Sequence, residues 1–286
     1  MNVIRETVDH PGASLRVLRL RLDRFDGAHH RHPQLELTWI ERGSGLRLVG
    51  DSAEAFDDGD LVLLGSQLPH HWVSTPRAGE GLLACTVLQF APAMLSAGAI
   101  PELATAQSLA LQAHRGLHIV GGTAEAVCAE LRQLPDDSLS RVGTLLRILG
   151  RLGSAPADLR PLSRASASAG SETPGGGSRR VDRVVDWIHR HYTRALGVDD
   201  AAQLAHVSPA AFSRWFRREM GKPFTEYLND LRVGAASIKL RQSRLPIAHV
   251  AQACGFSTLS HFNTQFRRRH GVSPREFRVA SAPVLR

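Results

Sequence analysis

The chain has 286 residues, about twice the length of a usual globular domain, so one or two domains are expected. Its 43% hydrophobic and 22% charged residues exclude wholesale disorder and a collagen-like fold. No apolar run reaches the ~18 residues of a membrane-spanning helix, and the first residues lack the apolar core of a signal peptide. The three cysteines are odd in number and far apart, at positions 85, 128 and 254. These features together predict a cytoplasmic protein without membrane partners.

The net charge of +8 is unevenly distributed along the chain. Residues 1–178 carry 16 basic and 19 acidic side chains, whereas residues 179–286 carry 19 basic and 8 acidic ones. An acidic half joined to a strongly basic half indicates that only the second half contacts a polyanion.

A segment rich in Ser, Ala, Gly and Pro lies where the charge changes sign, at residues 154–178. Such a composition is typical of a flexible linker, which predicts domains at 1–153 and 179–286. The alternative is a long surface loop inside one domain, but structureless loops of 25 residues are uncommon.

Short strands are predicted in the first ninety residues. Apolar and polar residues alternate over 15–25, and short β-like runs follow at 35–40, 45–49, 60–64 and 82–90, with Gly, Asp and Pro between them. Strands of this length and spacing predict a small barrel or sandwich.

Two amphipathic helices are predicted between residues 122 and 152, because apolar residues there recur at helical spacing. They have two interpretations. They pack against the strands, or they form a hairpin through which the chain makes a homodimer.

The basic half is predicted to be entirely helical. The expected helices are 180–194, 198–206, 208–220, 223–243, 246–254, 257–270 and 273–279. Ser208-Pro209 and Ser273-Pro274 supply an N-cap followed by proline, and Glu276 completes a capping box. Gly221 and Gly271 are placed where helices end.

An internal repeat with an offset of 49 to 50 residues divides this half. The copies begin at Val198 and Ile247, and each contains a short helix, a tight turn and a second helix followed by clustered arginines. This is the pattern of a helix-turn-helix motif, whose second helix enters the DNA major groove. The connector, 223–243, spans about 31 Å as a helix, close to the ~34–36 Å between successive major grooves on one face of DNA. The sequence therefore predicts that one chain contacts two successive grooves.

A set of residues in the basic half also matches a known family. They are Pro246, Ile247, Ala248, Ala251, Gly255, Phe256, Ser257, Phe262, Phe266, Arg267, Gly271, Ser273, Pro274, Phe277 and Arg278, with Tyr227, Leu228, Arg232, Ala235 and Ala236 in the connector. With these residues, positions 180–280 closely resemble the DNA-binding domain of AraC/XylS transcription regulators. The resemblance implies double-stranded promoter DNA as a partner, with RNA polymerase as a further one.

Residue roles follow from the second helix of each motif. By resemblance, base contacts fall on Ala210, Ser213, Arg214, Ser260, His261 and Thr264. Arg214 is the main candidate, because a guanidinium binds guanine O6 and N7 together. Arg217, Arg218, Arg267, Arg268 and Arg269 are expected to bind phosphates. The alternative is that these arginines only form a solvated face.

The acidic half contains a second, weaker resemblance. His30, His32, Glu36 and Gly43 reproduce the spacing of the first cupin motif, and the region from Gly59 to His70 resembles the second motif less fully. The resemblance implies a small cupin-like β-barrel over residues 14–90.

The polar residues of this region have three interpretations. His30, His32, Glu36 and His70 form a metal site for Fe, Mn, Ni or Zn, or they are polar contacts in an effector pocket, or they are satisfied core residues. Trp72 offers a stacking face for a sugar or belongs to the core.

The fold class predicted is α+β multidomain: an N-terminal cupin-like barrel with trailing helices, and a C-terminal all-α domain with two helix-turn-helix motifs. The favoured function is a transcription regulator, with activator among its expected roles, whose barrel binds a small effector such as a carbohydrate. The alternative is a metal-dependent cupin enzyme that carries a DNA-binding domain. No nucleophile–base set, P-loop or dinucleotide fingerprint supports an enzyme.

Overall fold

The structure, a computed structural model, describes residues 4–8, 14–25, 30–74, 81–96, 100–163 and 177–280. Contacts divide the chain into two compact units. The first comprises Met1–Ser44 and Phe56–Gly170, and the second comprises Gly45–Ala55 and Ser171–Arg286. Among the described residues, no helix is both long and apolar enough to cross a membrane.

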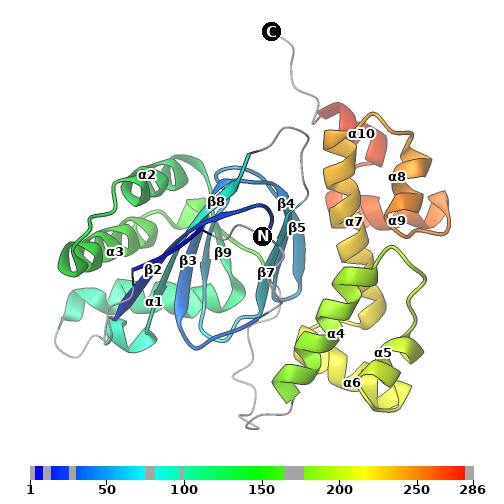
Figure 1. Cartoon of the computed structure of the whole chain (residues 1–286), viewed down its shortest axis with the longest axis horizontal. Coiled ribbons are helices and arrows are strands. Elements are labelled where there is room, and N and C mark those ends of the chain that lie inside the picture. Colours follow the sequence, from blue (N-terminus) through cyan, green and yellow to red (C-terminus); the bar gives the residue numbers. More distant parts are fainter. Residues whose placement is uncertain are drawn as a thin grey trace. The chain divides into compact units, whose positions relative to one another are not determined.

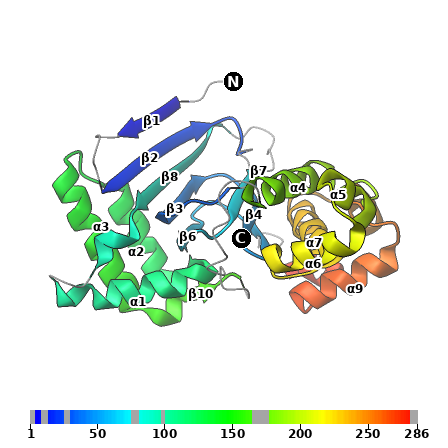
Figure 2. The same ribbon diagram turned by 90° about the horizontal axis from the view of Figure 1, so that it is seen from below.

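The first unit is built on a seven-stranded antiparallel sheet (Figures 1 and 2). In spatial order its strands are β1 (Ile4–Val8), β2 (Leu15–Leu22), β8 (Leu83–Phe90), β3 (Leu35–Arg42), β6 (Leu61–Leu64), β9 (Leu117–Ile119) and β10 (Leu159–Pro161). A further strand, β7 (His70–Ser74), begins at the residue that bridges His30. The predicted strands of the N-terminal half are therefore confirmed, and an antiparallel sheet domain is present.

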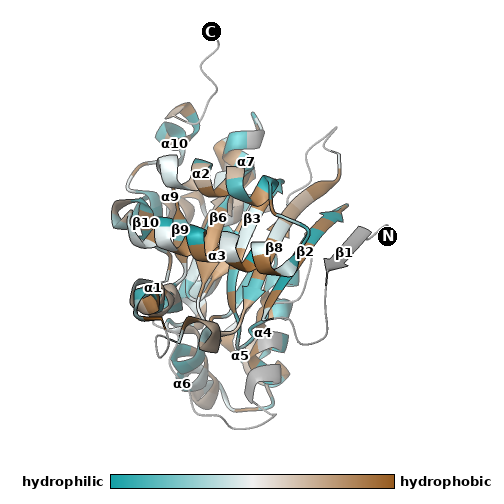
Figure 3. Ribbon diagram, turned by 90° about the vertical axis from the view of Figure 1, so that its left-hand side faces the viewer, coloured by the Kyte–Doolittle hydropathy of each residue, from teal (hydrophilic) through white to brown (hydrophobic). Residues whose placement is uncertain are grey.

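Three α-helices cover one face of this sheet (Figure 2). They are α1 (Ala104–Gln112), α2 (Gly121–Arg132) and α3 (Ser138–Gly153), and short 3-10 turns lie at Pro92–Leu95, Pro101–Leu103, Ala113–Arg115 and Pro156–Asp158. The shared core joins Leu37 and Leu63 of the sheet to Val127, Leu145 and Ile148 of the helices. In this sheet β6 is fully buried and apolar, and it is drawn in brown (Figure 3). The helices predicted at 122–152 are confirmed, and they pack against the strands.

The segment predicted as a linker is structured at its start. Residues 156–158 form a 3-10 turn, and β10 then pairs with β9, so that Leu159 lies opposite Ile119. The sequence did not predict this strand, because β10 is only three residues long and lies in a stretch rich in Ser, Ala and Pro. Residues 164–176 lie outside the described residues, and helix α4 begins at Gly177. The linker therefore stays a prediction for 164–176 only.

The second unit contains a hairpin and seven helices. The hairpin is β4 (Gly45–Val49) with β5 (Ser52–Phe56). The helices are α4 (Gly177–His191), α5 (Val198–Leu204), α6 (Pro209–Met220), α7 (Phe224–Gln242), α8 (Ile247–Ala253), α9 (Leu259–His270) and α10 (Pro274–Ala280). Each lies within a few residues of its predicted range, so the all-helical prediction for the basic half is confirmed.

The repeat forms two helix-turn-helix motifs, α5–α6 and α8–α9. Phe212 and Phe216 of α6, like Phe262 and Phe266 of α9, are fully buried. The turns use left-handed backbone at the equivalent positions His206 (φ 55°) and Gly255 (φ 85°). Both second helices also end on a left-handed glycine, Gly221 or Gly271, as predicted.

Candidate functional site

The second helix of the first motif, α6, separates a buried stripe from an exposed one. Its N-cap Ser208 accepts a hydrogen bond from the backbone N–H of Ala211 at 3.3 Å, and Pro209 occupies the first helical position. Because Phe212 and Phe216 turn inward, all the DNA-contacting residues predicted on α6 are exposed: Ala210, Ser213, Arg214, Arg217 and Arg218. This face is therefore open to a ligand within its unit.

The second motif repeats the arrangement on α9. Thr258 caps the helix by accepting a hydrogen bond from the backbone N–H of His261 at 3.2 Å. The predicted contact residues on α9 are likewise exposed: Ser260, His261, Thr264, Arg267 and Arg268. The two helices thus present equivalent polar faces, each ending in a cluster of arginines.

Hydrogen bonds distinguish the roles available to these side chains. The hydroxyls of Ser213 and Thr264 donate to the carbonyl oxygens four residues earlier, at 2.9 and 3.1 Å, which leaves their oxygens as acceptors. Arg218 forms an exposed ion pair with Glu219 at 3.0 Å. A phosphate contact by Arg218 must therefore compete with that carboxylate, although an exposed pair of this kind is weak.

Arg269 is bound inside the second unit instead of projecting freely. Its guanidinium donates to the carbonyl oxygen of Ala53 at 3.0 Å and lies 3.7 Å from a carboxylate oxygen of Glu54. The sequence had grouped Arg269 with its phosphate-binding neighbours, and no local signal predicts a contact with a hairpin more than 200 residues away.

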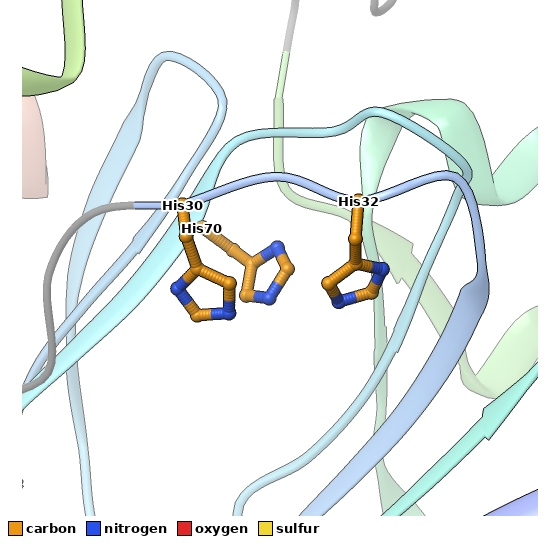
Figure 4. Close-up of side chains that lie close together, drawn as sticks. All are labelled: His30, His32 and His70. Atoms are coloured by element: carbon orange, nitrogen blue, oxygen red, sulfur yellow. The ribbon is translucent and has the colours of Figure 1, made fainter. Parts of the chain in front are cut away.

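In the first unit, three histidines converge although they come from separate segments. His30 and His32 precede β3, and His70 opens β7; their rings lie close together (Figure 4). One nitrogen of each lies within 4.8 Å of the others. The backbones of His30 and His70 hold this arrangement, because each N–H donates to the other's carbonyl, at 3.2 and 3.0 Å.

Glu36 supports the histidines from β3 and is 4% exposed. His32 Nε2 lies 2.9 Å from Oε2, which also accepts a hydrogen bond from Gln89 at 2.9 Å, while Thr38 donates to Oε1 at 2.5 Å. Burial raises the pKa of Glu36, but the charge of His70 and these hydrogen bonds outweigh burial and lower it to about 2. Glu36 is therefore a carboxylate whose oxygens are already occupied, which suits it to orient His32.

His70 has a defined tautomer and one unused nitrogen. Its Nδ1 lies 2.9 Å from the carbonyl oxygen of Leu68, which only accepts, so Nδ1 carries the proton. Nε2 is buried, 3.6 Å from Glu36, and has no hydrogen-bond partner among the described residues. Burial lowers the pKa of His70 to about 4, so the ring is neutral near pH 7. Nδ1 of His32 is also buried and unpartnered. Both nitrogens are therefore positioned to contact a cation or a hydroxyl group of a ligand.

Trp72 lies beside the cluster but is largely buried. Its ring meets that of His70 edge-on at 5.9 Å, and its indole N–H donates to Asp60 at 3.3 Å. Asp60 also lies 3.3 Å from His118 Nε2. This places Trp72 in the wall of the cluster.

The sequence missed two members of this site, Thr38 and Gln89. Thr38 shares the strand parity of Glu36, which was a usable signal. Gln89 faces Glu36 only through the register of β3 with β8, which a single sequence does not provide.

Comparisons with known proteins agree with the two motifs. The family described as "Helix-turn-helix domain" matches residues 201–280. The "HTH-type transcriptional activator RhaR" of Escherichia coli O139:H28 is 25% identical over 258 residues, covering 88% of this chain and 86% of the relative. The activator RhaS of Escherichia fergusonii is 34% identical over 99 residues, covering 35% of this chain and 36% of that protein.

Solved structures resemble the chain as well. A transcriptional regulator described as AraC-type, from Chromobacterium violaceum, is 28% identical with a TM-score of 0.35, covering 38% of this chain and 97% of that one. The curated relatives are transcriptional activators and not enzymes, which disagrees with the alternative of a metal-dependent cupin enzyme.

Proposed function

We propose that this chain is a transcription regulator of the AraC/XylS type, and that a small effector bound in its N-terminal domain controls how it engages a promoter. The helix-turn-helix match over residues 201–280 and the similarity to RhaR over 88% of the chain support this proposal. The chain acts as an activator, a role that the names of the relatives support. An activator contacts RNA polymerase as a partner, and the chain works as a homodimer. The N-terminal sheet is proposed to close into a cupin-like barrel around the effector.

One observation carries the DNA-binding part: two equivalent helices, α6 and α9, present exposed polar faces above buried phenylalanines. Arg214 is proposed to bind a guanine, because its side chain lies on the exposed face of α6, six residues after the N-cap Ser208. Alongside it, base contacts are assigned to Ala210, Ser213, Ser260, His261 and Thr264, and phosphate contacts to Arg217, Arg218, Arg267 and Arg268.

The effector part rests on the cluster of His30, His32, Glu36 and His70. Two buried nitrogens without partners indicate that the site is incomplete without a ligand, because such groups are costly to leave unpaired. A polyhydroxylated effector would donate hydroxyl hydrogens to these nitrogens, with Trp72 in the wall.

A metal ion also fits the donor set. Three histidines, with one nitrogen of each within 4.8 Å of the others, suit Zn, Ni, Fe or Mn, and Glu36 would orient His32 as a hydrogen-bond acceptor. Such an ion would supply a point of attachment for an oxygen ligand.

DNA binding is tested by selecting sequences from a random duplex library with the full chain. The expected result is an enriched site with two subsites about one helical turn apart. Enrichment of a single subsite would contradict simultaneous use of α6 and α9.

The effector site is tested by thermal shift of the full chain with neutral sugars and, separately, with Zn²⁺, Ni²⁺, Mn²⁺ and Fe²⁺. A stabilising ligand should lose its effect in His70→Gln and keep it in His249→Gln, which removes an exposed histidine of the second unit. A sugar-only response identifies an effector pocket, and a metal-only response identifies a metal site. No response, or equal loss in both variants, contradicts the proposal.

A further inference from the structure

A second pocket lies in the first unit, on the sheet face that carries the helices. It has a volume of about 260 Å³ and is lined by strands β2, β8 and β3 and the end of α2. The residues that line it are Arg19, Leu20, Arg21, Trp39, Glu41, Ala84, Cys85, Thr86, Leu131 and Arg132. None of them belongs to the histidine cluster.

Strand register explains why these side chains meet. Arg19 pairs with Thr86 on β8, and Thr86 pairs with Trp39 on β3, so the three residues form one row across the sheet. The register of β3 and β8 then shifts between Ile40 and Arg42, which marks a β-bulge around Glu41. Bulges redirect side chains and are common beside binding sites. Here Glu41 reaches Thr86, whose hydroxyl donates to it at 2.6 Å.

The pocket lies on the opposite face of the sheet from the histidine cluster. Trp39 shares the buried face of Leu35 and Leu37, whereas Glu36 and Thr38 alternate to the other side, where they meet the histidines. The two sites therefore share strands β3 and β8 but not side chains.

Trp39 supplies a buried hydrogen-bond donor without a partner. The residue is 2% exposed, and its indole N–H makes no hydrogen bond to any described part of the chain. An unsatisfied buried donor destabilises the fold, so its retention in the wall of a pocket indicates an acceptor that arrives with a ligand.

The charged groups of the lining identify the kind of acceptor. Among the residues that line the pocket, Arg19, Arg21 and Arg132 supply three guanidinium groups and Glu41 supplies one carboxylate, which already accepts from Thr86. Among the described side chains, Arg19 makes a long hydrogen bond, 3.4 Å, to the carbonyl oxygen of Leu134, and its register partner on β1 is Glu6. The guanidinium carbon of Arg132 lies 5.0 Å from the centre of the Trp39 ring, and its charge offsets the negative end of the α2 dipole.

We propose that this pocket binds a small organic anion, through paired guanidinium contacts to a carboxylate or phosphate group and a hydrogen bond from the Trp39 indole. Guanidinium groups bind both kinds of oxyanion in a forked geometry, which a lysine cannot reproduce. A bound anion would link the end of α2 to strands β2 and β3. The N-terminal domain would then respond to two ligands, because the proposed effector cluster lies on the other face of its sheet.

The test is an NMR titration of the full chain, labelled with ¹⁵N at its tryptophan indoles. Trp39→Phe identifies the Trp39 signal among the four tryptophans. The probes are inorganic phosphate, a sugar phosphate and a sugar carboxylate such as glucuronate, with glucose as the neutral comparison. We expect saturable movement of the Trp39 signal with at least one anion and none with glucose. Response to phosphate compounds alone or to carboxylates alone identifies the source of the oxyanion.

Three variants complete the test. Arg132→Gln removes an exposed cation of the pocket and should weaken binding at least tenfold. Arg151→Gln removes an exposed cation of α3 that pairs with Glu130 outside the pocket, and should leave binding unchanged. His70→Gln should also leave it unchanged, which separates this site from the effector cluster. Absence of a saturable shift, equal weakening by both arginine variants, or loss of binding in His70→Gln would overturn the proposal.

Discussion

Single residues decide the geometry of the two helix-turn-helix turns. Gly255 has φ 85°, and a Cβ added there would lie 2.5 Å from the carbonyl oxygen of Tyr192 and 2.9 Å from Arg232 Nε. That carbonyl already accepts a hydrogen bond from Arg232 at 2.8 Å, so neither group has room to move. The equivalent His206, at φ 55°, shows that the first turn tolerates a side chain.

We therefore expect Gly255→Ala to destabilise the second unit by about 2–4 kcal/mol, through the combined cost of left-handed backbone and steric overlap. The matched change His206→Ala should cost less than about 1 kcal/mol, because that site already holds a Cβ. Urea unfolding of both variants measures the difference, and equal losses would show that the contact around Gly255 relaxes freely.

DNA contacts are also decided by single residues. Arg214→Ala should relax the preference at one base position, with a loss of about 1–3 kcal/mol on the favoured sequence. Arg268→Ala should weaken all sequences alike and lower the salt slope by about one. Titrations at several salt concentrations separate the two effects. Arg190→Ala, on the exposed side of α4, is the control, and identical behaviour of Arg214→Ala and Arg268→Ala would refute the assignment.

His270 makes the second unit sensitive to acid. Its ring packs between Phe266 and Phe277, at 4.5 and 4.7 Å, and burial, assisted by the charge of Arg269, lowers its pKa to about 4. In the unfolded chain His270 becomes protonated below about pH 6.5, whereas in the folded chain it becomes protonated only near pH 4. Stability is therefore greatest above pH 6.5 and falls as the pH drops toward 4.

The variant His270→Phe should remove this dependence while keeping the aromatic packing. We expect it to flatten the loss of stability between pH 6.5 and 4.5 by about 1–2 kcal/mol, allowing for solvent screening of a partly exposed ring. Chemical denaturation at both pH values measures the slope. An unchanged slope would mean that His270 protonates freely in the folded protein.

At the scale of elements, the periodicity of apolar residues predicted the elements that depend on local sequence alone. The helices of the basic half and α2–α3 were located because their apolar residues recur over several turns. The missed elements, β1, β5, β7, β9, β10 and α1, are mostly short. A short strand such as β10 is stabilised by its pairing with β9, and the local sequence of β10 does not predict that pairing.

The candidate sites divide in the same way. The exposed faces of α6 and α9 followed from helical spacing alone. His30, His32 and Glu36 followed from motif spacing, but their meeting with His70, and the presence of Gln89, depends on long-range pairing. The pocket of Trp39 and three arginines had no sequence signal, because its members come from three strands and a helix.

The N-cap of α9 provides a test at this scale. Thr258→Ala removes the acceptor for the backbone N–H of His261 and should cost about 0.5–2 kcal/mol of stability, whereas Thr258→Ser should keep most of it. Because α9 is proposed to contact DNA, fraying of its first turn should also weaken binding. Unfolding and DNA titrations of both variants check this, and equal stability of the two would show that the cap is dispensable.

At the scale of the whole molecule, an acidic N-terminal half precedes a basic half that contains the two helix-turn-helix motifs. The linker predicted from composition is now confined to residues 164–176, since β10 occupies part of the earlier range. We expect limited proteolysis of the native chain to cut first within 164–176, leaving resistant fragments on both sides. Mass spectrometry of the fragments identifies the cuts, and first cleavage elsewhere, for example within 100–163, would contradict the linker.

Helix α7, 19 residues long and about 28 Å from end to end, lies between the two DNA-binding motifs. The length of α7 fixes the rotation of one motif relative to the other about the DNA axis, as well as the distance between them. One base pair inserted between two operator subsites turns the second by about 34° and shifts it by about 3.4 Å, because B-DNA has ~10.5 base pairs per turn. A rigid connector has no means to follow that rotation. The operators of this protein are therefore expected to vary in base sequence yet keep a constant spacing between their two subsites. The number of residues in α7 sets that spacing.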